Sequence, residues 1–242
     1  STPFSLVPKM ILQSGVVQVE VVQDDYSGHD EIFVLDNDGA VKRLNLDYEE
    51  EAEGEEDHDE EHAIYLIDQV AVKDGVKSIS GGDRHLLMLM WDGSVWGVGD
   101  RALGQLGNGQ DSRNYPNYVP FDQPIKISSF SDVTSISAGY SHSLLIKEDG
   151  SLWGMGQNWS GQLGINKNES TYTELDETGS PYALENIPVQ ILSSGVSQIS
   201  AGSNNSIFIK TDGSLWGMGY NMSGQLGLGT FGTDTARFEE NV

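Results

Sequence analysis

The sequence predicts an all-β fold, a β-propeller of about four repeated units. One segment recurs three times in register, and each copy places Asp-Gly between two apolar runs. No stretch shows the long apolar period of an amphipathic helix. Several short strands per unit, at a period of roughly 50 residues, are typical of propellers and β-solenoids.

The repeated segment is predicted to hold three strands. Its copies begin at Val76, Val133 and Val196, and the distance from this valine to Asp-Gly is the same in each. The runs Val-x-x-Ile-Ser and Ser-Leu-Leu-Ile-Lys are rich in β-branched and apolar residues, as strands are. Asp-Gly between two strands is a hairpin signal, for which we expect a two-residue type I′ turn with positive φ at both positions.

A fourth, degraded copy precedes these three. It begins at Pro8 and has Asp38-Gly39 at its turn, but it lacks the Trp-Gly and Gly-Gln-Leu-Gly segments. Residues 47–62, DYEEEAEGEEDHDEEH, stand in their place as an acidic insertion. We expect residues 1–242 to form one repeat domain. Its approximate units are 8–64, 65–120, 121–187 and 188–242.

The composition excludes several functional classes. With 37 acidic and 13 basic residues and a net charge of −24, the chain is a poor partner for nucleic acid or an anionic membrane. The absence of cysteine excludes disulfides, Cys-based zinc sites and a cysteine nucleophile. No apolar run is long enough for membrane insertion. Because the chain begins at Ser1 without a basic-then-apolar leader, we expect a processed or excised piece.

The acidic insertion contains His-Asp-Glu-Glu-His at residues 58–62, the spacing of some zinc peptidases. No apolar period builds a rigid helix around it. We therefore interpret residues 47–62 as a solvated loop that binds divalent cations at most weakly. Residues 36–39 place glycine at the fourth position rather than the sixth and do not fit a calcium-binding EF-hand loop.

The glycine-rich segment 154–161 does not fit a nucleotide-binding fingerprint. Four residues separate its second and third glycines, and neither a helix nor Gly-Lys-Ser/Thr follows. Its recurrence in three copies favours a packing role, with Gln105, Gln162 and Gln225 bonded to backbone. We predict no catalytic residue, no metal site, no cofactor and no enzymatic activity.

Histidine recurs at positions 85 and 142 but is replaced by Asn205 in the next copy. We interpret it as a structural hydrogen-bonding residue. Trp91 and Trp159 lie outside the repeat register and are candidates for an exposed contact surface. The tryptophans in register, which we expect in the core of each unit, are Trp96, Trp153 and Trp216.

Residues 138–144 (Ala-Gly-Tyr-Ser-His-Ser-Leu) and 156–164 (Gly-Gln-Asn-Trp-Ser-Gly-Gln-Leu-Gly) resemble the repeat of the regulator of chromosome condensation (RCC1-like) family. The resemblance covers about residues 70–230. It implies a propeller of seven four-stranded blades, whereas this chain has about four units. The sequence leaves open a fragment of a longer propeller, an open arc completed by another chain, and a smaller closed ring.

Light-sensing relatives in that family carry tryptophan within Gly-Trp-Arg-His segments. The corresponding residues 82–85, 139–142 and 202–205 lack this tryptophan, which disfavours photoreception.

The resemblance implies a binding scaffold, because propellers present variable loops at the faces of a rigid disc. Two sets of loops are expected to make the contacts. After the Gly-Gly or Ala-Gly pair, the candidate binding residues are Arg84, Tyr140 and Ser203. In the loop that ends in Gly-Gln-Leu-Gly, they are Arg101, Trp159 and Met222.

We therefore predict a non-enzymatic scaffold that binds another protein or itself, at an extracellular or cell-surface location. One alternative is a structural subunit that self-assembles through strand edges into a ring or filament. The other is a GTPase-regulating, nucleotide-exchange propeller, an activity found in the family that the chain resembles.

Overall fold

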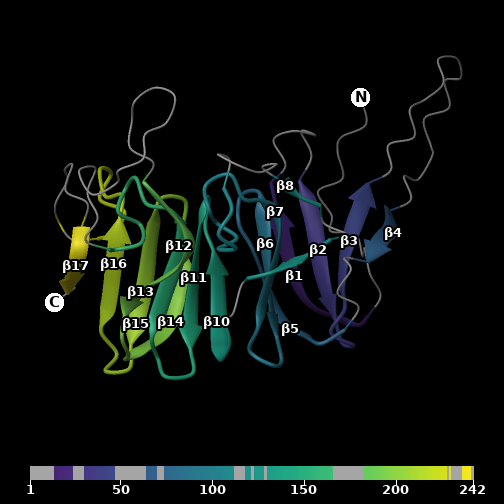
Figure 1. The fold of residues 1–242 in the computed structure, drawn as a ribbon, viewed down its shortest axis with the longest axis horizontal. Helices are drawn as coiled ribbons and strands as arrows, with labels where there is room; N and C mark the ends of the chain where they lie inside the picture. Colours follow the sequence, from purple (N-terminus) through teal and green to yellow (C-terminus); the bar gives the residue numbers. More distant parts are fainter. Residues whose placement is uncertain are drawn as a thin grey trace, which may run out of the picture.

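The computed structural model describes residues 14–23, 30–46, 64–69, 74–111, 118–120, 123–127, 130–165, 183–227, 229 and 236–240. These residues form four antiparallel sheets and no helix, which confirms the all-β prediction. Figure 1 shows the sheets side by side in chain order, from β3 and β4 at one end of the row to β16 and β17 at the other.

In each sheet the first four strands form a meander in which consecutive strands pair, and the second sheet has a fifth strand as well. The first sheet consists of β1 (Val16–Val22), β2 (Glu31–Asp36), β3 (Val41–Leu46) and β4 (Ile64–Gln69). The second consists of β5 (Val76–Gly81), β6 (His85–Met90) and β7 (Val95–Asp100), with β8 (Tyr118–Val119) and β9 (Ile125–Lys126) both paired to β7. The third consists of β10 (Val133–Ala138), β11 (His142–Lys147), β12 (Leu152–Gln157) and β13 (Leu184–Leu192). The fourth consists of β14 (Val196–Ala201), β15 (Asn205–Lys210), β16 (Leu215–Gly219) and β17 (Ala236–Glu240).

The sheets do not begin where the sequence units were expected to begin. The Pro188 segment, placed at the start of the fourth unit, lies in β13 and is the last strand of the third sheet. A short turn at 193–195 then leads directly into β14. The last strand of one sheet and the first strand of the next therefore form one continuous stretch of sequence, which spans two sheets.

The Asp-Gly segments connect the second and third strands of each sheet. The Met90 N–H donates to Ser94 O at 2.8 Å and the Gly93 N–H donates to Met90 O at 3.0 Å. Of the turn residues, only Gly93 has a positive φ, at 76°. The expected two-residue type I′ turn is therefore wrong: the loop has three residues, a type I turn followed by a left-handed glycine. Asp92 favours this form, because its Oδ1 accepts the Ser94 N–H at 2.9 Å and holds the aspartate in the turn.

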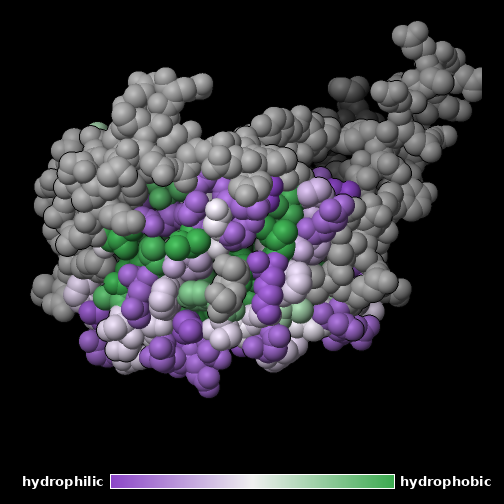
Figure 2. Space-filling model, viewed as in Figure 1, coloured by the Kyte–Doolittle hydropathy of each residue, from purple (hydrophilic) through white to green (hydrophobic). Residues whose placement is uncertain are grey.

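These turns lie along the lower edge of the molecule in Figure 1. Figure 2 shows mostly hydrophilic residues along that edge and hydrophobic ones across the middle of the same side.

The hydrophobic core lies between successive sheets. Phe33 and Leu35 of the first sheet pack with Ile79 of the second, and Leu144 of the third packs with Phe208 of the fourth. The tryptophans expected in the core are only partly buried and pack against the margins of these clusters. In the third and fourth sheets the indole N–H reaches a serine of the Asp-Gly turn, which keeps the polar edge of the ring near the turn. These pairs are Trp153 with Ser151 at 2.8 Å and Trp216 with Ser214 at 2.7 Å.

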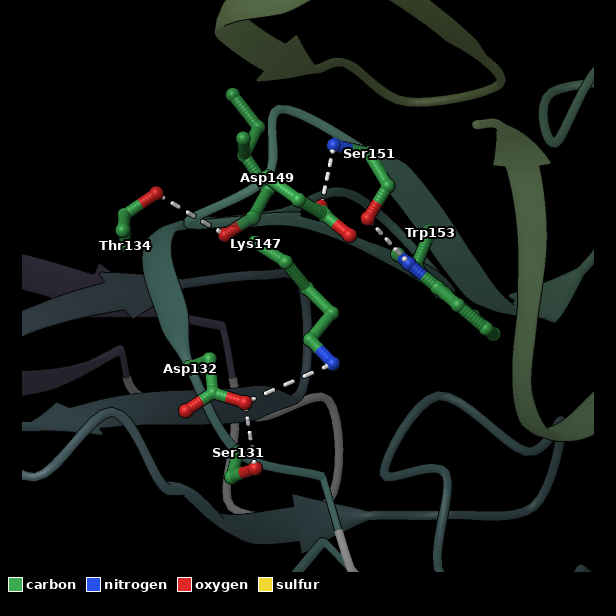
Figure 3. A network of polar contacts seen from close by, with 8 residues as sticks. Ser131, Asp132, Thr134, Lys147, Asp149, Ser151 and Trp153 are labelled. Atoms are coloured by element: carbon green, nitrogen blue, oxygen red, sulfur yellow. Dashed lines mark hydrogen bonds and ion pairs between the residues drawn. The ribbon is translucent and has the colours of Figure 1, made fainter. Parts of the chain in front are cut away.

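The residue directly before the first strand of the third sheet is an aspartate, whereas the other sheets have glycine at this position. Asp132 has a φ of 63°. Its Oδ2 accepts a hydrogen bond from Ser131 Oγ at 2.9 Å and lies 4.0 Å from Lys147 Nζ (Figure 3). Aspartate is among the few non-glycine residues that visit this conformation readily. The equivalent residues, all with positive φ, are Gly15, Gly75 and Gly195.

The predictions for the acidic insertion, residues 47–62, lie outside the described residues. Within the described ranges, no group of three or more histidine or acidic side chains is arranged to hold a metal ion. In the same ranges there is no helix long and apolar enough to cross a membrane.

Candidate functional site

The first strands of the four sheets, β1, β5, β10 and β14, lie next to one another in sequence order. Where they end, the chain forms a hollow of about 380 Å³. Each sheet contributes residues from the same register positions. The last strand residues in the hollow are Val21, Gly81, Ala138 and Ala201, followed by a glycine position at Gly82, Gly139 and Gly202.

The glycine position allows successive sheets to approach closely. A Cβ atom on Gly139 would lie 2.4 Å from Cε1 of His142 and 2.5 Å from the carbonyl oxygen of Gly202. A Cβ atom on Gly82 would meet His85 and the carbonyl oxygen of Gly139 in the same way. Distances this short are forbidden, so the floor of the hollow requires glycine where one sheet meets the next.

The residue after each glycine forms the rim of the hollow and differs between sheets. These residues are Asp83, Tyr140 and Ser203, and the first sheet adds Gln23 and Asp30. The backbone holds the rim, because the Asp83 and Tyr140 N–H groups donate to the glycine carbonyl of the next sheet, at 3.3 and 3.1 Å. Tyr140 is 45% exposed and Asp30 is exposed as well, so the rim offers an aromatic ring and a carboxylate to a partner.

The charge at this end of the sheets is predominantly acidic. Arg84 lies 3.7 Å from Asp100 (Nη1 to Oδ2). Burial raises the pKa of Asp100, and the Ala102 N–H and the Arg84 guanidinium offset only part of that effect. Arg101 is buried and donates to Gln110 Oε1. The lysines of the described residues all lie near the opposite, hairpin end of their strands: Lys42, Lys77, Lys126, Lys147 and Lys210.

The six predicted binding residues all belong to loops at this end. Tyr140 and Ser203 line the hollow. Trp159 and Met222 are 57% and 52% exposed, in turns outside the residues that line it. Arg84 and Arg101 make the contacts given above within their own sheet, and Arg101 is buried.

Two residues of the hollow, Gln23 and Asp30, were not found from the sequence. They flank residues 24–29, where the first copy carries an insertion that obscures the repeat register. Trp91, proposed as a contact residue, is 72% exposed. It lies in an Asp-Gly turn at the end of the sheets opposite the hollow, where Lys77 Nζ is 5.8 Å from the centroid of its ring.

A His-Ser pair lies under the floor of the hollow at two sheet junctions. His85 Nε2 lies 2.9 Å from Ser143 Oγ, and Ser143 Oγ donates to the Gln105 carbonyl oxygen at 2.8 Å. Since the hydroxyl proton points to that carbonyl, Ser143 accepts the Nε2 proton of a neutral imidazole. His142, Ser206 and Gln162 repeat this arrangement at the next junction, with distances of 2.8 and 2.8 Å.

These pairs resemble a serine nucleophile with its base only in composition. Both histidines and Ser143 are fully buried, and the serine proton is directed away from the ring. Burial lowers the pKa of His85 to about 3 and that of His142 to about 4, so both rings are neutral. This confirms the structural interpretation of the repeated histidine.

The glutamine predictions are also confirmed, because each side-chain Oε1 accepts a backbone N–H within its own turn. The pairs are Gln105 with Leu103 at 2.9 Å, Gln162 with Ser160 at 3.0 Å and Gln225 with Ser223 at 2.9 Å.

The row of four antiparallel sheets, of four or five strands each, and the hollow at the ends of their first strands define a propeller-type repeat protein. Matches to a known repeat then identify its family. Residues 92–146 and 149–209 match the regulator of chromosome condensation (RCC1) repeat, and residues 133–162 and 196–225 match a second description of the same repeat. The chain belongs to the RCC1-like repeat family.

Relatives with established names are similar over about two thirds of this chain. The ultraviolet-B receptor UVR8 of Arabidopsis thaliana is 29% identical over 155 residues, which cover 64% of this chain and 31% of the receptor. The guanine nucleotide exchange factor SRM1 of Saccharomyces cerevisiae is 29% identical over 167 residues, 66% of this chain and 33% of the factor.

Among solved structures, yeast RCC1 (Prp20) bound to Kap60 aligns with 95% of this chain at a TM-score of 0.70 and 25% identity. The alignment covers 49% of that protein. The chain thus spans about a third of these relatives and half of the solved propeller.

Proposed function

We propose that this chain is a non-enzymatic, regulatory binding module, which holds a protein partner at the hollow and the loops around it. The observation that carries the proposal is the construction of the hollow. A glycine floor is repeated in the second, third and fourth sheets, whereas the residue after it changes from the buried Asp83 to the exposed Tyr140 and Ser203. A constant scaffold with one variable residue per sheet is suited to recognition, because the rim can vary without affecting the junction beneath it.

The chemistry of the rim favours a partner with a basic contact patch. Asp30 and Tyr140 are exposed there, and Arg84 is placed against Asp100. A cationic side chain inserted into the hollow would meet a carboxylate and could stack on an aromatic ring. The net charge of −24 would also accelerate encounter with a basic partner at low salt.

The class of partner that we propose is a small GTPase. Support comes from the exchange factor SRM1, and from a solved yeast Prp20 structure whose description includes binding to Gsp1p and histones. The chain covers only a third of SRM1, so exchange activity in the chain itself is part of the proposal. From the net charge of −24 we predict that nucleic acid is not the partner. The extracellular or cell-surface location likewise stays a prediction from composition.

The test is a nucleotide-release assay. The purified chain is added to small GTPases loaded with fluorescent GDP, and binding is followed in parallel by biolayer interferometry. We expect binding to at least one GTPase, with faster release, and a loss of affinity of at least about 10-fold for Tyr140→Ala and for Asp30→Lys. Trp91→Ala, at an exposed residue at the far end of the sheets, is the matched control and should bind unchanged.

Binding without faster release would support the binding module and contradict exchange activity. No binding to any GTPase tested, or equal losses in all three variants, would contradict the proposed partner and the proposed site respectively.

A further inference from the structure

Two buried ring nitrogens lie directly under the floor of the hollow. A Cβ atom on Gly82 would lie 2.6 Å from Nδ1 of His85, and one on Gly139 would lie 2.7 Å from Nδ1 of His142. Both histidines are fully buried, and among the described residues neither Nδ1 atom has a hydrogen-bond partner. The glycine backbone that lines the hollow is therefore in contact with two polar atoms whose bonding capacity is unused.

The hydrogen bonds of the rings determine which end of each ring meets the floor. Nε2 of His85 carries the proton and donates to Ser143, so Nδ1 is the unprotonated nitrogen with a lone pair. His142 has the same arrangement with Ser206. Each ring dipole thus has its negative end towards the hollow, in a buried environment where water screens it little.

The fourth sheet keeps an acceptor under the floor although it has no histidine at this position. A Cβ atom on Gly202 would meet Oδ1 of Asn205, the residue that replaces the repeated histidine. The three glycines of the floor therefore each lie against a side-chain acceptor, which makes the floor electronegative in every sheet that contributes to it.

The first sheet adds acceptors at the edge of the hollow. At the other two junctions the corresponding glycine carbonyl accepts an N–H of the preceding sheet, at 3.3 and 3.1 Å. Among the described residues, no N–H of the first sheet reaches the Gly82 carbonyl oxygen in this way, and Gly82 is partly exposed. Gln23 and Asp30 line the same hollow and are exposed, so a ligand there meets an amide, a carboxylate and a backbone carbonyl. No lysine or arginine is among the described residues that line the hollow, so none of them supplies the matching positive charge.

These acceptors favour a guanidinium over an ammonium group. They belong to three separate groups, and a guanidinium presents five N–H donors in one plane, whereas an ammonium presents three from a single point. The guanidinium is also less strongly hydrated and stacks on aromatic rings, and the Tyr140 ring at the rim is 45% exposed. The volume of about 380 Å³ is at the lower end of the range for small-ligand pockets, which suits one side chain.

We propose that the hollow binds a single arginine side chain of the partner protein. The guanidinium bonds the Asp30 carboxylate and the Gly82 carbonyl oxygen and stacks on the Tyr140 ring, above the negative ends of the two buried imidazoles. This inference rests on the proposed function, because it names the group through which a partner protein occupies the hollow.

The test uses a capped arginine, N-acetyl-arginine amide, in an amide NMR titration of the isotope-labelled chain. We expect saturable shifts of the Gly82, Asp83 and Tyr140 signals, with a dissociation constant on the order of 1 mM for this single side chain. Capped lysine carries the same charge and should bind at least about 5-fold more weakly. Capped citrulline has the same shape without the charge and should give no saturable shift.

Two variants locate the bound arginine. Asp30→Asn and Tyr140→Leu should each weaken binding at least about 3-fold, because they remove the carboxylate and the stacking ring. Glu148→Gln and Trp91→Leu make matched changes at exposed residues of the opposite, hairpin end, and both should leave the dissociation constant unchanged.

Absence of saturable shifts with capped arginine would overturn the inference, as would equal binding of capped lysine or capped citrulline. Equal weakening by Asp30→Asn and Glu148→Gln would also overturn it, since that result indicates unspecific attraction to an acidic chain. The outcomes separate this inference from the proposed function. If capped arginine binds but no GTPase does, the proposed partner fails and the arginine site remains. If a GTPase binds at the hollow and capped arginine does not, only the arginine site fails.

Discussion

The Nε2 atom of His85 lies 2.9 Å from the Oγ atom of Ser143, and this contact joins the second sheet to the third. The Ser143 hydroxyl in turn donates a hydrogen bond to the Gln105 carbonyl oxygen of the second sheet. One buried hydroxyl thus satisfies a donor and an acceptor of the neighbouring sheet, and the junction depends on it.

Replacing Ser143 with alanine should lower the free energy of unfolding by roughly 1–3 kcal/mol, because it leaves the His85 N–H and the Gln105 carbonyl buried without this partner. Urea denaturation measures the change. Ser197→Ala is the control: its exposed hydroxyl bonds the Ile209 carbonyl at 3.0 Å, and its loss should cost under about 0.5 kcal/mol. Equal effects of the two variants would contradict the junction role of Ser143.

The stability of the protein should fall as the pH drops from 6.5 towards 4. Burial lowers the pKa of His85 to about 3 and of His142 to about 4, from an ordinary 6.5. Below pH 6.5 the two histidine rings therefore bind protons in the unfolded chain but stay neutral in the folded chain, which lowers the free energy of unfolding. Above pH 6.5 both rings are neutral in both states, and the effect vanishes. At pH 5 each ring should lower the free energy of unfolding by roughly 2 kcal/mol.

The His142→Asn variant isolates this effect. Asn205 occupies the same position in the fourth sheet, so asparagine fits the register. Denaturation curves at pH 5 to 6 should show a slope reduced by up to about 1.4 kcal/mol per pH unit in this variant. An unchanged slope would mean that His142 is protonated in the folded protein.

Gly139→Ala should be far more destabilising than Gly195→Ala. An added Cβ at Gly139 meets the His142 ring and the Gly202 carbonyl within 2.5 Å, and neither can move without opening the junction. Gly195 has a φ of +85° but nothing within 4 Å, so alanine there meets only backbone strain of about 1 kcal/mol. We expect the Gly139 variant to lose more than about 3 kcal/mol in thermal or urea unfolding. A smaller loss than in Gly195→Ala would contradict close packing of the hollow floor.

At position 132, glycine should be tolerated and alanine should not. Asp132 holds a φ of 63° in a place where the other sheets use glycine. Asp132→Gly relieves that conformation while losing the Ser131 and Lys147 contacts, so its net effect should be within about 0.5 kcal/mol. Asp132→Ala loses the same contacts and keeps the strain, and should be about 1 kcal/mol less stable than the glycine variant. Equal stabilities, compared by differential scanning calorimetry, would contradict this account.

The sequence predicted the all-β repeat architecture well, because the residues that repeat are those that each sheet needs for its turn and its junction. The Asp-Gly segments recur because each forms the turn between two strands, and the buried histidines recur because each bonds a serine of the next sheet. The turn type was wrong because the Asp92 side chain bonds the backbone two residues on, an interaction that stabilises a three-residue loop. The boundaries of the sheets differ from those of the expected units because the Pro188 segment lies in β13, which pairs with β12 as the last strand of the third sheet, and only a short turn separates β13 from β14 of the next sheet.

The composition of the hollow was only partly predictable. Tyr140 and Ser203 were found because they follow the repeated glycine, but Asp30 joins them through spatial proximity and not through sequence register. The sequence also did not predict that Arg101 is buried and bonded to Gln110, because both are polar residues of a loop, where exposed side chains are expected. Such contacts depend on how sheets lie against each other, which a repeat pattern alone does not specify.

The glycine floor has an evolutionary consequence. Its contacts are met by backbone and by residues on the inner side of the junction, so the exposed rim positions, Tyr140 and Ser203, can change their side chains almost independently of folding, whereas Asp83 is buried. New binding specificity can therefore arise by single substitutions, one sheet at a time, and a duplicated sheet brings another adjustable position with it.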